Sequence, residues 1–489
     1  MGPSDQPGPN RPGVRTTPVA GRPTGPPPDD ALLSSLHAAG PADDAAVPAD
    51  DAALPADDAA LPADDAALPA DDAAPRITGP VGFTQSLARL IGWVAGLPTG
   101  WITGFAVVVW AASAFYTIHF GAGWHLDLQV YRAAGSSLYH GGSPFDEYFT
   151  PVVLPFTYTP FALLVLSPLS LGALGLVESL WWGISAVCLV AASALMIRSA
   201  FDLGARRAWA IAALLGGTAT LALEPVRSNF DYGQINVILM LMVVADLTGV
   251  HGRARGILVG LAAAVKLTPM IYLVYFAAGR EWRALARAVA ALAAATALGW
   301  AVLPSGSARY WFHEFFSAKR VGAPGIVSNQ SWNGMVHRAP FDGSHLGTLV
   351  WIGLSLGTLA LGIVLTRWLI TSGRGAEAVL VLALTELLVS PISWTHHWSW
   401  LVLAPIVAAS VARVHRWVAA AITVEVLLAV VTPYLWNLHG PLGDVASNTL
   451  VLGAAAVLVL WFAAEALRRR SVSAACSKQM VGLGDLSGG

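Results

Sequence analysis

Long apolar runs recur along the chain from about residue 98 onward, and short polar segments separate them. About 20 apolar residues in a row are enough for a helix to cross the hydrocarbon core of a membrane. The pattern therefore predicts an all-α polytopic membrane protein. The clear runs lie near residues 98–118, 174–198, 207–224, 235–250, 285–303, 346–370, 376–392, 398–412, 417–435 and 448–467.

Two further apolar segments do not fit one plain span each. Tyr158–Leu171 is short and contains two prolines, and Gly256–Gly279 carries the sequence KLTP at residues 266–269. We expect Tyr158–Leu171 to lie along the outer membrane surface. We expect Gly256–Gly279 to form two short helices that go out and back, with the turn at Lys266–Pro269.

Clusters of arginine predict the orientation of the spans, because cytoplasmic loops carry an excess of Lys and Arg. An arrangement of about twelve helices places every cluster inside, with both termini cytoplasmic. Eleven plain spans are the alternative, and they would put the Arg198 and Arg253 clusters outside. The clusters are Arg198 with Arg206 and Arg207, Arg253 with Arg255, Arg280 with Arg283, Arg367 with Arg374, Arg413 with Arg416, and Arg468 to Arg470.

Composition agrees with a membrane protein: 55% of the residues are hydrophobic and 12% are charged, whereas a soluble domain has about 25% charged residues. The net charge of −2 gives no sign of a nucleic-acid partner. Cys188 lies in an apolar run and Cys476 lies in the C-terminal tail, so we expect no disulfide and no cysteine metal site.

The first 80 residues differ from the rest, because they contain PADDAAV followed by PADDAAL copies between Pro41 and about Ala74. A proline in every repeat prevents a regular helix. We expect residues 1–80 to be a disordered acidic tail, residues 81–470 to be the membrane domain, and residues 471–489 to be a cytoplasmic C-terminal tail.

The favoured topology places nearly every unusual polar cluster on the outer side. A channel or transporter would instead place polar groups near the membrane midplane, so this arrangement is typical of an enzyme that acts on a lipid-borne substrate. The clusters are Asp127 within Trp124–Tyr158, EPVRSNFDYGQIN at 224–236, KLTP at 266–269, SNQSWNGMVHR at 328–338, SPISWTHHW at 390–398 and WNLHGPLG at 436–443.

Each polar side chain also has a purely structural interpretation. Asp127 fits a helix cap, Lys266 fits a lysine that reaches toward the lipid headgroups, and the paired His396 and His397 fit interfacial histidines bonded to carbonyls. Arg227 fits a membrane anchor, and the polar residues at 329–333 fit an ordinary loop.

The residues DLQVYRAAGSSLYHGGSPF at 127–145 and FTYTPFALLVLSPLSLG at 156–172 resemble the mark of a prokaryotic membrane glycosyltransferase family. This is the polyprenyl-phosphate-mannose-dependent α-(1,2)-mannosyltransferase family of actinobacteria, glycosyltransferase family 87. GQIN at 233–236, KLTP at 266–269 and SPISWTHH at 390–397 are similar to that family as well, and the resemblance covers about residues 95–470. The family's aromatic-Tyr-Pro-Pro element reads Tyr158-Thr159-Pro160 at its end here, with Thr159 in place of the first proline.

The resemblance implies a GT-C type fold with the active site at the outer face of the plasma membrane. It implies a polyprenyl-phosphate-mannose donor and a glycolipid acceptor, namely a hydroxyl of a phosphatidylinositol mannoside or lipomannan. The transfer would be a single displacement with inversion, with Asp127 as the base. No cofactor or metal is expected if protein cations hold the phosphate.

Candidate site residues follow from these requirements. Negative charge builds on the departing phosphate, so cationic and donor groups are needed around it, and the candidates are Lys266, Arg227, His396 and His397. The candidates for binding substrate are Tyr131, Gln234, Asn236, Asn329, Gln330, Asn333 and Trp394.

Two other functions remain open at this point. The same helices would suit an arabinofuranosyltransferase that uses a polyprenyl-phosphate arabinose donor. A transporter of lipid-linked sugars would use carboxylates within the membrane, and the apolar runs contain Glu178, Glu377, Glu386 and Glu425.

Overall fold

The structure is a computed structural model, and it describes residues 96–120, 125–340, 342–436, 438 and 440–486. The N-terminal repeats within residues 1–80 lie outside the described residues, so their disorder stays a prediction. Trp124 and parts of the segment WNLHGPLG lie outside them as well.

Several helices are long and apolar enough to cross a membrane, which confirms a multi-pass, all-α membrane architecture. There are five among the described residues, or six if the bent pair α7 and α8 counts as one span with its 82° bend. The predicted count of about twelve includes shorter helices and stays a prediction. The long helices are α3 (Thr99–Phe120), α6 (Leu174–Ala200), α12 (Trp282–Val302), α16 (His345–Thr371) and α21 (Thr449–Leu486), and the bent pair is α7 (Ala205–Ala222) with α8 (Glu224–Asp231).

Shorter helices fill the space between the long ones. The centre of the bundle is α17 (Gly375–Val389), in which every residue from Ala376 to Leu388 is buried. It packs against α16, α18 and α21. The other inner elements are α9 (Asn236–Val244) with a π-helical turn at Ala245–Gly249, the 3-10 helix η6 (Thr395–Leu403), α18 (Ala404–Val411) and α19 (Arg416–Leu435).

The segment that we expected to turn at Lys266–Pro269 is a hairpin. It consists of α10 (Ile257–Val265), the 3-10 helix η4 (Thr268–Tyr272) and α11 (Leu273–Ala278). Arg255 before the hairpin and Glu281 after it form an ion pair, with Nη2 2.8 Å from Oε1. Because the two ends meet, the chain goes out and comes back, as predicted.

Close packing of α10 on α12 sets the depth of the turn. A Cβ placed on Gly260 would lie 2.2 Å from the backbone oxygen of Ala288, so only glycine allows this approach. The nine residues of α10 rise about 14 Å. The Lys266 turn therefore lies beside the middle of the 21-residue α12, and its place at the outer face stays a prediction.

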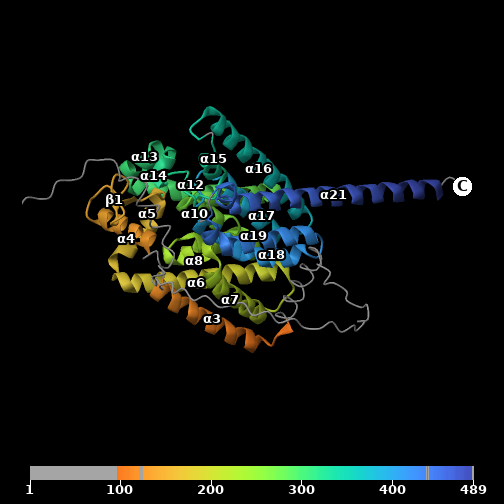
Figure 1. Cartoon of the computed structure of the whole chain (residues 1–489), viewed down its shortest axis with the longest axis horizontal. Helices are drawn as coiled ribbons and strands as arrows, with labels where there is room; N and C mark the ends of the chain where they lie inside the picture. The colour runs from red at the N-terminus through yellow and green to blue at the C-terminus, as the bar shows by residue number, and fades with distance from the viewer. Residues whose placement is uncertain (1–95, 121–124, 341, 437, 439, 487–489) are drawn as a thin grey trace, which may run out of the picture.

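Most of the short elements gather at one end of the bundle (Figure 1), opposite the end beyond which α21 extends. Tyr148 pairs with Pro155 in a two-stranded antiparallel sheet at this end. These elements are α4 (Leu126–Tyr139), β1 (Tyr148–Phe149), β2 (Leu154–Pro155), α5 (Pro160–Leu166), the 3-10 helix η1 (Ser167–Leu171), α13 (Pro304–Phe312), η5 (Glu314–Phe316) and α14 (Ala318–Val321). Two further short helices are α15 (Trp332–His337), which packs on α16, and α20 (Gly440–Ala446), which packs on α19.

The predicted surface segment Tyr158–Leu171 is two short helices, α5 and η1. The Thr159 hydroxyl accepts a hydrogen bond from the Ala162 N–H, and Pro160 occupies the first turn, so the sequence determines where α5 begins. The Arg132 guanidinium of α4 donates to the backbone oxygens of Leu169 and Gly172. These contacts hold the segment against α4, and it is too short for one span.

Candidate active site

The turn at Gly233 holds the beginning of α4, which carries Asp127. The backbone N–H of Asp127 donates to the Tyr232 oxygen at 3.0 Å. Gly233 has φ +68°, and a Cβ there would lie 2.7 Å from the Cβ of Leu128. Both facts require glycine at this position. The GQIN motif therefore positions the carboxylate that lies 106 residues before it in the chain.

Asp127 is the acidic residue in the first turn of α4 and is partly buried. Burial raises the pKa of its carboxyl from 3.8 to about 6, while a hydrogen bond with Gln234 and the charge of Lys266 act in the opposite direction. The helix N-terminus also favours a negative charge. A carboxylate with this pKa is mostly ionised at pH 7 and accepts a proton readily.

Two tyrosines link Asp127 to the loop before α5. The Tyr131 hydroxyl donates to the Tyr158 hydroxyl at 2.8 Å, and the Tyr158 hydroxyl donates to Gln234 Oε1 at 2.9 Å. Burial raises the pKa of both phenols, so both remain hydrogen-bond donors. This chain of donors fixes the orientation of the Gln234 amide, which then holds Asp127.

Lys266 lies beside this network at the turn of the hairpin. Its Nζ donates to Asn236 Oδ1 at 2.8 Å and lies 3.0 Å from His397 Nε2. It also lies 5.5 Å from the centre of the Tyr158 ring. Because a lysine ammonium donates only, the Nε2 atom of His397 is an acceptor and carries no proton.

Asn236 connects the histidine pair to the lysine. Its Nδ2 donates to the backbone oxygen of His396 at 3.1 Å, while its Oδ1 accepts from Lys266. The His396 ring packs edge-on against His397 and Tyr232. Gln234 and Asn236 thus hold the acid side and the basic side of one cluster.

A small cavity of about 10 Å³ lies next to Lys266, a volume that admits roughly one water molecule. Its lining includes Asn236, Lys266, Thr268, Glu386 and His397. The Glu386 carboxylate of α17 interacts with the charge of Lys266 and with the Thr268 hydroxyl. Glu386 is therefore a counter-charge to the lysine.

Sequence reasoning missed Tyr158 and Glu386 as members of this cluster. Tyr158 was visible as part of the aromatic-Tyr-Thr-Pro element. Glu386 lies in an apolar run, which gave no signal of its partner on a distant hairpin.

Arg227 lies in α8 and has other contacts. Its guanidinium lies over the Tyr116 ring at 5.9 Å and donates to the Leu221 oxygen at 3.4 Å. Its charge also interacts with Glu224 and Asp231, as balancing charges would. A role of Arg227 in phosphate binding stays a prediction.

The loop amides are buried and bind the SPISW segment. Asn329 Oδ1 accepts from the Ser393 N–H at 2.8 Å, and Asn333 Nδ2 donates to the Pro391 oxygen at 3.0 Å. Gln330 Nε2 donates to the Ser447 oxygen at 2.7 Å. Asn329 also pairs with Trp394 in a β-bridge. These contacts position the segment that leads to His397, and sugar binding by these residues stays a prediction.

Most of the glutamates within apolar runs have partners. Glu178 lies 3.6 Å from His125, and Glu377 pairs with Arg374. Glu425 alone is buried without a hydrogen-bond partner among the described residues. No group of three or more potential metal ligands occurs in the part of the chain that the structure describes.

Comparison with known proteins places this chain in a family. The model of glycosyltransferase family 87 matches residues 156–391. A polyprenol-phosphate-mannose-dependent alpha-(1-2)-phosphatidylinositol pentamannoside mannosyltransferase of Mycolicibacterium smegmatis is 34% identical over 330 residues, which are 65% of this chain and 79% of that protein. A protein of the same description from Mycobacterium tuberculosis is 36% identical over 331 residues, which are 65% of this chain and 76% of that protein.

A solved structure also resembles the chain. It is the crystal structure of ArnT from Cupriavidus metallidurans bound to undecaprenyl phosphate, with 18% identity and a TM-score of 0.32. The match covers 77% of this chain and 79% of that chain.

Proposed function

The chain belongs to glycosyltransferase family 87, and from this premise we propose that it transfers mannose from polyprenyl-phosphate-mannose to a phosphatidylinositol mannoside or lipomannan of the cell envelope. One observation carries the proposal: Gln234 and Asn236, two residues apart, hold the Asp127 carboxylate and the Lys266 ammonium in one cluster. The names of the relatives support mannose as the sugar and an α-(1→2) linkage in the product.

The reaction is a single displacement at the anomeric carbon. The acceptor oxygen forms a bond to that carbon while the bond from the carbon to the phosphate oxygen breaks. The hydroxyl proton passes to Asp127, and the polyprenyl phosphate leaves with the electron pair. One carboxylate is enough for this inversion, whereas a retaining hydrolase uses two. A β-linked donor therefore gives an α-linked product.

The leaving phosphate gains negative charge, and Lys266 supplies the compensating positive charge. Asn236 and His397 accept from the ammonium and fix its position, so the charge is in place before the reaction begins. A bound phosphate would compete with Glu386 for the same ammonium. His396 and Arg227 are the further candidates for phosphate contacts.

The remaining candidates have supporting roles in the proposal. Tyr131 is fully buried and holds Gln234 through Tyr158, so its contribution to substrate binding would be through that network. Trp394 lies in the segment between the loop amides and His397, where its ring would contact the sugar or the isoprenoid chain. Asn329, Gln330 and Asn333 support that segment. They would help to bind the sugar by holding the segment in position.

We place the site at the outer face of the plasma membrane, with both termini in the cytoplasm. Arginines concentrate at the bundle end opposite the short elements, as a cytoplasmic face requires. Arg374 pairs there with Glu465, and Arg468 Nη2 donates to Ser372 at 3.3 Å. The opening to Asp127 would then face outward.

Two donors separate the proposal from its nearest alternative. Purified protein is incubated with a phosphatidylinositol mannoside and either polyprenyl-phosphate-mannose or polyprenyl-phosphate-arabinofuranose, each labelled in the sugar. The proposal predicts transfer from the mannose donor only. Transfer from the arabinose donor alone, or movement of labelled lipid across vesicles without any transfer, would overturn it.

A further inference from the structure

A large cavity of about 530 Å³ lies at the same end of the bundle as the short elements, apart from the Lys266 cluster. This large cavity and the small cavity beside Lys266 have no lining residue in common. Its volume falls within the range of about 300–1,000 Å³ that is typical of small-molecule sites. Neither the proposed base nor the proposed phosphate groups line it, so the cavity has another task.

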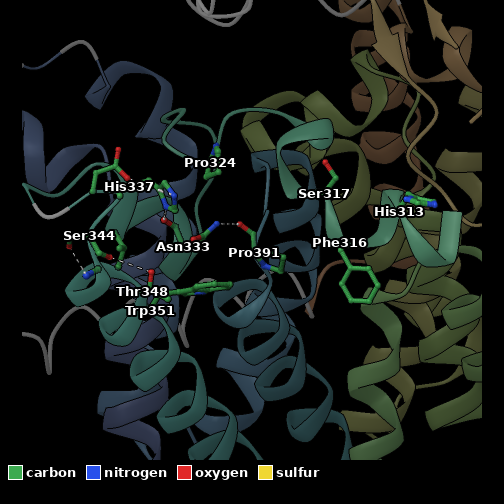
Figure 2. Close-up of a pocket in the computed structure, with 14 residues that line it drawn as sticks. His313, Phe316, Ser317, Pro324, Asn333, His337, Ser344, Thr348, Trp351 and Pro391 are labelled. Carbon is green, nitrogen blue, oxygen red and sulfur yellow. Dashed lines mark hydrogen bonds and ion pairs between the residues drawn. The ribbon is translucent and has the colours of Figure 1, made fainter. Parts of the chain in front are cut away.

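Figure 2 shows the walls of this cavity. His337 of α15 and Ser344 and Thr348 of α16 lie on one side, and His313 and Phe316 lie on the other. The Trp351 ring lies below Asn333 and forms the floor. An aromatic surface is therefore surrounded by hydrogen-bonding side chains, of which Asp342 is acidic.

Trp351 has an unsatisfied donor. Its indole Nε1 is buried and makes no hydrogen bond to any residue that the structure describes. The neighbouring Trp332 differs, because its Nε1 donates to Thr358 at 2.9 Å. A buried N–H group without a partner is costly, and among the described indole N–H groups that lack one, that of Trp351 is the one in this cavity. An oxygen of a bound molecule would satisfy the Trp351 donor.

The lining suits a sugar ring more than a phosphate or a hydrocarbon chain. A hexose has a face of C–H groups that packs on an aromatic ring, and its rim of hydroxyls both donates and accepts hydrogen bonds. Among the described residues that line the cavity there is no lysine or arginine, so a phosphate would lack a lysine or arginine partner there. A hydrocarbon chain would cover the polar groups of Thr348, Asn333 and His337 without forming hydrogen bonds to them, which is unfavourable.

A direct structural connection joins this cavity to the reaction centre. Asn333 donates to the Pro391 oxygen in the cavity wall, and His397 beside Lys266 is six residues further along. Six residues extend at most about 21 Å. A glycan of several sugars would span that interval, with one end at the reacting centre and another part in the cavity.

We propose that this cavity binds mannose residues of the acceptor headgroup that do not react, and so selects acceptors with longer glycans. The inference rests on the proposed function. Binding energy from remote parts of a substrate positions the reacting hydroxyl and raises the rate. The enzyme would therefore discriminate acceptors by the part of the glycan distant from Asp127.

The test compares acceptors of different length in the full-length protein. Trp351→Phe keeps an aromatic ring at this position but removes the indole N–H, and Trp351→Ala removes both the aromatic ring and the N–H. Trp417→Phe on the exposed face of α19 is the matched control. With a tetramannosylated phosphatidylinositol acceptor we expect Trp351→Phe to lower kcat/KM about 2- to 10-fold and Trp351→Ala to lower it further. A simple alkyl mannoside should be unaffected, and the donor KM should not change.

A second measurement does not depend on transfer. Binding of a free mannotetraose to the purified protein, followed by saturation-transfer NMR, should be present in the wild type and in Trp417→Phe and absent in Trp351→Ala. This result would support the cavity even if the proposed transfer failed. Unchanged acceptor preference with unchanged mannotetraose binding in Trp351→Ala would overturn the inference. The inference would also be overturned if Trp351→Ala released a lipid chain bound in the cavity and left oligomannoside binding unchanged.

Discussion

The Nζ atom of Lys266 lies 3.0 Å from Nε2 of His397, although the two residues are 131 positions apart in the chain. Lys266 is at the turn of the α10–α11 hairpin, and His397 is the third residue of the 3-10 helix η6. This contact keeps His397 neutral on that nitrogen and directs the ammonium toward the cluster that holds Asp127. The proposed donor site depends on this arrangement.

Replacement of Lys266 tests that site. Lys266→Gln keeps a polar side chain but removes the positive charge that would stabilise the departing phosphate. Hydrogen bonds to charged groups contribute about 1.5–3 kcal/mol, so we expect kcat/KM for the donor to fall roughly 10- to 100-fold. The measurement is initial rate against donor concentration at saturating acceptor.

Arg283→Gln is the control for this charge removal, because Arg283 is exposed at the beginning of α12. It should behave as the wild type. An unchanged donor dependence in Lys266→Gln would remove the lysine from the phosphate site.

Asp127→Asn tests the base. The amide has a similar shape and can still face Gln234, but it cannot accept the hydroxyl proton. General-base contributions are about 10²- to 10⁴-fold, and we expect a loss of that size in kcat with little change in thermal stability. Asp202→Asn, an exposed carboxylate in the loop before α7, should retain full rate. A near-normal turnover in Asp127→Asn would assign the base elsewhere.

The pH dependence follows from the same carboxyl. Asp127 acts as a base only when ionised, and its pKa is raised from 3.8 to about 6. Activity should therefore fall as the pH drops through about 6, with log kcat/KM decreasing by one per pH unit. Gln234→Leu removes a hydrogen bond that lowers this pKa, so its acid limb should move to higher pH. A wild-type profile that stays flat down to pH 4.5 would contradict the assignment.

Packing of the hairpin gives a stability prediction. The position of Gly260 against Ala288 leaves no room for a side chain, so Gly260→Val should force α10 away from α12. Overpacking of a tight contact costs about 1–3 kcal/mol, and Lys266 would be displaced with the helix. We expect a lower unfolding temperature in detergent and a higher donor KM. Gly353→Val on α16, where a Cβ would meet nothing within 4 Å, should leave both values unchanged.

Much of the fold could be predicted because hydropathy reports which segments avoid water. The runs near 98–118, 174–198, 285–303 and 346–370 became α3, α6, α12 and α16. The hairpin at Lys266 could be predicted because the arginine clusters on both sides required an even number of crossings. The break at Thr395–Leu403 was not visible, since nearly every residue of this 3-10 helix is buried and an apolar run without a polar face does not reveal its helical period.

The site could be predicted only in part. Asp127, Lys266 and His397 stood out as charged or titratable groups in apolar surroundings, and the resemblance linked them. Asn329, Gln330 and Asn333 could not be separated into sugar contacts and loop supports, because an amide that binds a carbonyl looks the same in a sequence. The counter-charge Glu386 and the free N–H of Trp351 depend on neighbours that only the folded chain brings together.

The configuration of the product is the most direct measurement of the central claim, that Asp127 is the single carboxylate that drives a one-step transfer. Purified enzyme is given β-linked polyprenyl-phosphate-mannose and a phosphatidylinositol mannoside, and the new glycosidic bond is examined by NMR. The account predicts an α-mannosyl linkage in the product from the first turnover onward. A β-mannosyl linkage would contradict it, because retention requires a second displacement.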